Sequence, residues 1–252
     1  MKPVIQQSQE LDKYKEEARE LLKKSGFPLF ENIFVGIDST LPFMGYTTVN
    51  KNNEPLIVVS KMAIDSGNVV GLLVHEMGHI YQTEQKHPSH NFPMLEKAID
   101  YALQGEKLSS FQSDVLHNIV NCIEDIYADD VSFEIFKKFP QKTFPLEKMN
   151  EFFLSWVHKP LTVKTQHETW QNAEFVVDAA FAKANLVRHA IVDTDEKMEK
   201  KIEIFLQHVD SKNAKLYEYF ETFFIQLPKT ISETEFGRMV IEYIRTFLSL
   251  IQ

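Results

Sequence analysis

The sequence predicts an α+β protein in which α-helices dominate. Only 8 glycines and 10 prolines occur among 252 residues, which argues against a turn-rich all-β protein. Three short β-prone runs stand near the N-terminus, and apolar residues recur at helical spacing through most of the remaining chain. We therefore expect a small N-terminal sheet followed by many helices.

Each element is expected from a local pattern. A helix is expected over about 8–24, because apolar residues recur there at helical spacing until Gly26 ends it. Asp65 or Ser66 is expected to cap the next long helix, which continues to about Gln85 before Pro88 prevents further extension. The other expected elements are strands at 33–37, 45–49 and 56–59, and helices near 94–104, 110–136, 174–190, 195–207 and 233–250.

Composition and charge exclude several classes of partner. The formal net charge is −9, so the surface repels phosphate backbones and we expect no nucleic-acid partner. No run of about 18 apolar residues occurs, and residues 1–8 lack the apolar core of a signal peptide, so we expect no membrane span. The single cysteine, Cys122, cannot form an internal disulfide. These features predict a cytoplasmic protein.

One motif has the spacing of a metal site: His75-Glu76-Met77-Gly78-His79. On a helix, residues four apart project from one face, so both imidazoles can reach a single zinc ion at about 2.0–2.1 Å. Glu76 follows the first histidine and can act as general base on a metal-activated water. The alternative is two hydrogen-bonded core histidines with a surface glutamate. A di-iron site is not indicated, because it needs Glu-x-x-His on two different helices and Glu84 to His87 lies on or just past the same helix.

With this motif the chain resembles the zincin superfamily of metallopeptidases, over roughly residues 30–135. The resemblance implies a zinc cofactor, a peptide or protein substrate, and hydrolysis of peptide bonds with Glu76 as the base. It also implies that the strand before the motif helix, Leu56 to Ser60, pairs with the substrate backbone. A plain core strand is the alternative for that segment.

The third metal ligand is open between two carboxylates, and the alternative is a solvated acidic helix face with the ligand elsewhere in the chain. The third histidine of metzincins falls at Gln85, so that pattern fails, and the resemblance then favours gluzincins, which take a carboxylate from a later helix. Glu124 has the commoner residue type, whereas Asp125 is followed four residues later by Asp129, which would orient a ligand histidine. An aspartate needs a closer helix, and Gly78 would permit that approach.

The motif and the prolines together predict two regions. Residues 1–138 would form a zincin-like catalytic region, and 139–252 a helical C-terminal lobe that begins in a proline-punctuated segment, the two packed as one globular unit. Arg188 in that lobe is either a transition-state stabiliser or a solvated helix residue.

The functional alternative to a peptidase is a non-catalytic zinc-binding or interaction protein on a zincin scaffold, although metal binding alone would not need Glu76.

Overall fold

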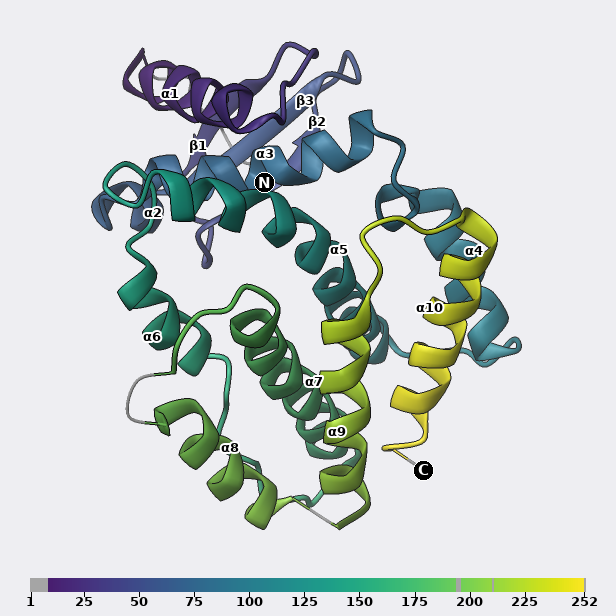
Figure 1. The fold of residues 1–252 in the computed structure, drawn as a ribbon. Helices are drawn as coiled ribbons and strands as arrows, with labels where there is room; N and C mark the ends of the chain where they lie inside the picture. Colours follow the sequence, from purple (N-terminus) through teal and green to yellow (C-terminus); the bar gives the residue numbers. More distant parts are fainter. Residues whose placement is uncertain (1–8, 194–195, 210, 252) are drawn as a thin grey trace. The chain divides into compact units, whose positions relative to one another are not determined.

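The computed structural model describes residues 9–193, 196–209 and 211–251, and it confirms a mostly helical α+β fold (Figure 1). Residues 1–8, on which the signal-peptide expectation rests, lie outside the described residues. Among the described residues, none of the helices combines the length and the apolar character needed to cross a membrane. The elements in chain order are α1 (Gln9–Ser25), β1 (Phe34–Asp38), β2 (Gly45–Val49), β3 (Pro55–Ser60), α2 (Lys61–Asp65), α3 (Val69–Glu84), η1 (Pro88–His90), α4 (Phe92–Leu103), α5 (Ser110–Lys138), η2 (Leu146–Lys148), α6 (Met149–Leu154), α7 (Gln166–Arg188), α8 (Lys197–His208), α9 (Ser211–Gln226) and α10 (Glu233–Leu248).

The chain divides into two compact units at positions that differ from the expected boundary at residue 138. The first unit comprises Met1–His87 and Tyr127–Leu146, and the second comprises Pro88–Ile126 and Glu147–Gln252. Residues 88–126 therefore group with the C-terminal helices. The long helix α5 is continuous across the division, because it runs unbroken from Ser110 to Lys138.

In the first unit, a three-stranded sheet has the order β1-β3-β2, with β1 parallel and β2 antiparallel to β3. The central strand is fully buried at Ile57, Val58 and Val59. The interpretation of β3 as the substrate-pairing strand is wrong, because neighbouring strands already occupy both of its edges. Among the described residues, β2 is instead the antiparallel edge strand of this sheet.

The motif helix α3 begins later than the sequence predicts. The predicted cap is wrong, because the N-cap of α3 is Asn68 rather than Asp65 or Ser66. A separate short helix, α2, capped by Ser60, precedes it and ends at Asp65. Gly67 then adopts a φ of +72°, a conformation that glycine allows at little strain, and α3 starts at Val69. Helix α1 packs against α3 (Figure 1), and its buried face includes Leu11, Ala18 and Leu22.

In the second unit, α7 packs against α9 and α10 packs against α4 (Figure 1). Helix α7 begins earlier than predicted, at Gln166, because Thr165 and Glu168 form a capping box. Arg188 is held by contacts with the backbone rather than left in solvent. Its guanidinium donates hydrogen bonds to backbone carbonyls at the end of α9, which is a structural role; these carbonyls belong to Phe224, Ile225 and Leu227, at 3.3, 3.0 and 2.8 Å.

Candidate metal centre

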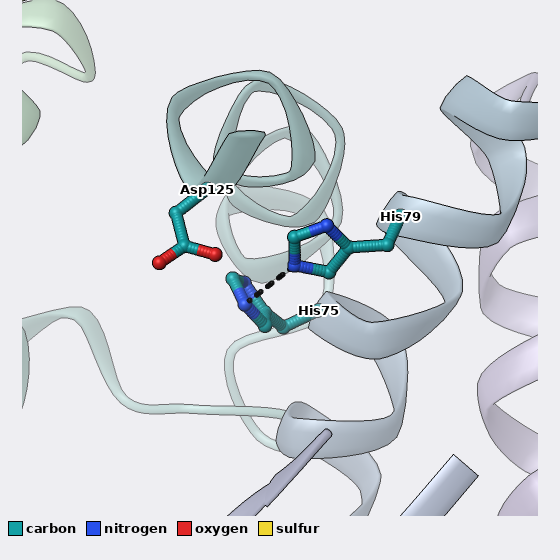
Figure 2. Close-up of side chains that lie close together, drawn as sticks. All are labelled: His75, His79 and Asp125. Carbon is teal, nitrogen blue, oxygen red and sulfur yellow. Dashed lines mark hydrogen bonds between the residues drawn. The ribbon is translucent and has the colours of Figure 1, made fainter. Parts of the chain in front are cut away.

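The two motif histidines lie one turn apart on the same face of α3. Their Nε2 atoms are 3.3 Å apart, and their rings meet edge to face with centroids 4.9 Å apart (Figure 2). Four tetrahedral ligands at about 2.0–2.1 Å from a zinc ion are separated by about 3.3–3.4 Å, which is 1.63 times the bond length. The observed separation of the two nitrogens therefore fits two corners of a zinc coordination sphere.

A contact of Nδ1, the nitrogen that faces away from His79, orients the ring of His75. His75 Nδ1 lies 2.9 Å from Asp129 Oδ1, and the Asp129 side chain is almost fully buried. An ionised carboxylate only accepts hydrogen bonds, so this contact favours the tautomer with the proton on Nδ1. The Nε2 lone pair that faces His79 is then available to a metal, which is the usual arrangement of a metal-binding histidine and its carboxylate partner.

Gly78 allows the close approach of α3 and α5. A Cβ atom at this position would lie 2.8 Å from the carbonyl oxygen of Ala128 and 3.2 Å from its Cα. The amide of Gln82 also donates a 2.8 Å hydrogen bond to the Tyr127 carbonyl, one turn further along α3. The prediction that Gly78 permits a close helix contact is confirmed, and this contact brings the acidic turn of α5 to the motif.

The two candidate carboxylates stand on the turn of α5 that adjoins Tyr127. Because α5 is continuous, Asp125 is held by its own helix one turn before Asp129 and projects from the same side. Ligand atoms of His75, His79 and Asp125 all lie within 4.8 Å of one another, and Figure 2 shows these side chains converging. Glu124 belongs to a different group, in which its ligand atom and those of His79 and His90 lie within 4.8 Å of one another. That group does not include His75.

Glu76 is nearly buried, with 4% of its surface exposed, on the side of α3 that packs against β2. Its Oε2 accepts a 2.8 Å hydrogen bond from the Thr47 hydroxyl, which comes from the edge strand. No local pattern predicts this partner, because Thr47 is only a β-prone residue in a strand that lies outside the motif. The alternative of a surface glutamate does not hold.

Cys122 does not belong to the cluster. It is a free, buried cysteine one turn before Asp125, and burial, followed by the nearby Asp178 and Asp125 carboxylates, raises the pKa of its thiol well above the usual value. Since a metal takes the thiolate, this environment disfavours Cys122 as a ligand. The thiol packs as a small apolar group.

These observations define a mostly helical α+β protein with a histidine–carboxylate cluster that could hold a metal ion. The chain belongs to DUF5781, a family of unknown function whose model matches residues 45–249. The matched range begins at β2 and includes the motif helix and α5. Neither a curated protein nor a solved structure matches the chain.

Proposed function

We propose that the protein is a zinc-dependent peptidase in which His75, His79 and Asp125 hold the metal. The observation that carries this proposal is the 3.3 Å separation of two imidazole nitrogens with a carboxylate within 4.8 Å. Three protein ligands leave one tetrahedral position open, which is typical of catalytic zinc sites. When bound, zinc supplies Lewis-acid activation of water and of the substrate carbonyl.

Asp125 is the preferred third ligand because its carboxylate groups with both motif histidines, whereas Glu124 groups with only one of them. Asp129 then has a separate role, since it contacts His75 through Nδ1 and fixes the ring. Both aspartates lie on one face of α5, four residues apart, so a single helix supplies the metal ligand and the orienting group.

Glu76 is the proposed general base. Its carboxylate accepts a proton from the attacking water and passes it to the leaving amine as the peptide bond breaks. Binding a metal does not need a glutamate at this position. A buried carboxylate beside the two histidines is therefore better explained by proton transfer than by structure alone.

The free edge of β2 is the proposed binding strand for the substrate backbone. Ser60 N–H donates to Met44 O and Asn50 N–H donates to Glu54 O, each at 2.8 Å, which sets the hydrogen-bonded pairs of the β2–β3 ladder. Because such pairs alternate along an antiparallel ladder, the backbone groups of Gly45, Thr47 and Val49 face away from β3. An extended peptide can pair with these groups.

The test compares wild type with Glu76→Gln. We expect about one zinc per chain in both proteins, and cleavage of a mixed peptide library by wild type only, because the amide cannot accept the proton. General-base catalysis contributes about 10²–10⁴-fold, so the variant should lose at least about 10² in kcat. Metal analysis with mass spectrometry of the products measures both. Wild type that binds zinc but cleaves nothing would support a non-catalytic zinc protein, and wild type that binds no zinc would overturn the site.

A further inference from the structure

We infer that Thr47 is a positioning residue, which couples the strand that binds the substrate backbone to the carboxylate that accepts the proton. The inference rests on the proposed function. Thr47 Oγ1 lies 2.8 Å from Glu76 Oε2 and 3.2 Å from the Glu76 carbonyl oxygen. A hydroxyl has one proton, and the shorter contact to the charged acceptor is the stronger bond.

The position of this hydroxyl is fixed by its strand. Thr47 is β-branched, so its χ1 angle has few allowed values in a strand. Two residues earlier on the same face, Gly45 brings β2 close to its neighbours, since a Cβ there would lie 2.8 Å from Val58 O and 3.1 Å from Leu72 Cδ2. The strand thus runs along α3 with Gly45 beside Leu72 and Thr47 beside Glu76.

The hydrogen bond from Thr47 gives the two carboxylate oxygens of Glu76 different roles. Oε2 is occupied by Thr47, while within the described ranges no residue donates a hydrogen bond to Oε1. Oε1 is the oxygen left to accept a proton from water. Thr47 therefore holds one rotamer of Glu76 in which the free oxygen has a defined direction.

The backbone of the same residue faces the other way. By the register of the ladder, Thr47 N–H and C=O point to the open edge of the sheet, where a peptide would pair. A substrate bound along β2 would contact the residue that orients Glu76. Binding of an extended peptide and alignment of the base then depend on one strand position, so a displaced β2 would impair both.

The experiment compares Thr47→Val, which removes the hydroxyl at nearly constant shape, with Thr47→Ser, which keeps it. Thr48→Val is the matched control, because the Thr48 side chain is exposed on the opposite face and its backbone faces β3. We expect Thr47→Val to lower kcat about 10–100-fold with KM little changed, Thr47→Ser to recover most of the rate, and Thr48→Val to match wild type. In the Glu76→Gln background, Thr47→Val should have no further effect on rate.

A second readout does not depend on activity. In metal-free protein, a double-mutant cycle between Thr47→Val and Glu76→Gln on the free energy of unfolding should give a non-zero coupling. Zero coupling, or an active wild type whose kcat is unchanged in Thr47→Val, overturns the inference alone. Equal losses in the Val and Ser variants also overturn it. A wild type without hydrolytic activity overturns the proposed function, whatever the coupling.

Discussion

Each unit has, among its described residues, a histidine–aspartate pair, and the two pairs differ in their surroundings. His75 Nδ1 lies 2.9 Å from Asp129, and its other nitrogen faces a second imidazole. His158 Nε2 lies 3.3 Å from Asp178, and its ring packs 4.5 Å from the ring of Phe175. Within the part of the chain that the structure describes, only the first pair contributes a residue, His75, to a group of three side chains that could hold a metal ion. A histidine–carboxylate pair alone, such as His158 and Asp178, therefore does not indicate a metal site. The pair becomes a candidate only where further ligand side chains converge on the histidine.

The largest expected difference between the pairs is in metal binding. His79→Ala removes one of the three proposed ligands, so the purified variant should contain almost no zinc. His158→Ala should keep about one zinc per chain, because its pair lacks the additional ligands. Elemental analysis of both variants under non-chelating conditions measures this. Equal zinc contents in the two would remove the distinction between the pairs.

The next largest effects separate the acidic residues of α5. Asp125→Ala should lose zinc almost completely, since only two protein ligands would remain. Asp129→Ala should weaken zinc affinity about 10–100-fold, because it only orients His75. Glu124→Ala should change affinity little, and competition with a chromogenic chelator gives all three values. If Glu124→Ala loses the metal and Asp125→Ala keeps it, the ligand assignment is reversed.

A comparison of two glycines, Gly78 and Gly237, tests the contact between α3 and α5 that brings His75 and Asp129 together. In Gly78→Ala the added methyl would meet Ala128 O at 2.8 Å, a contact that requires backbone displacement, so we expect a destabilisation of about 1–3 kcal/mol and weaker zinc binding. Gly237→Ala on α10 is the matched control. Its nearest atom is Met94 Sδ at 3.6 Å, and alanine favours the helix by up to about 1 kcal/mol. Urea unfolding of both variants should give shifts of opposite sign, and similar shifts would contradict the tight contact.

The smallest effect concerns the pH dependence of the second pair. Burial raises the pKa of Asp178 above its usual 3.8, and the hydrogen bond from His158 partly offsets this. In the folded state the carboxyl keeps a proton that the unfolded chain releases, so stability falls as pH rises from about 3.8 through the folded pKa. Asp178→Asn lacks this loss and should gain stability relative to wild type over that interval. Urea midpoints measured from about pH 4 to pH 6 compare the two, and parallel profiles would show that Asp178 is not destabilised by burial.

The sequence by itself determined the helical motif, the three strands and the fold class, because these depend on spacing within short segments. It also offered two neighbouring carboxylates as candidates for the third ligand of the proposed site and identified Gly78 as the position of close approach. Strand order was decided only by the tertiary structure, since pairing between distant segments leaves no local pattern, and β3 became the centre of the sheet rather than its edge. The preference for Asp125 over Glu124 and the bond from Thr47 to Glu76 have the same origin: neighbouring helix residues diverge by about 100°, and the packing of α5 and β2 on α3 selects which side chains meet.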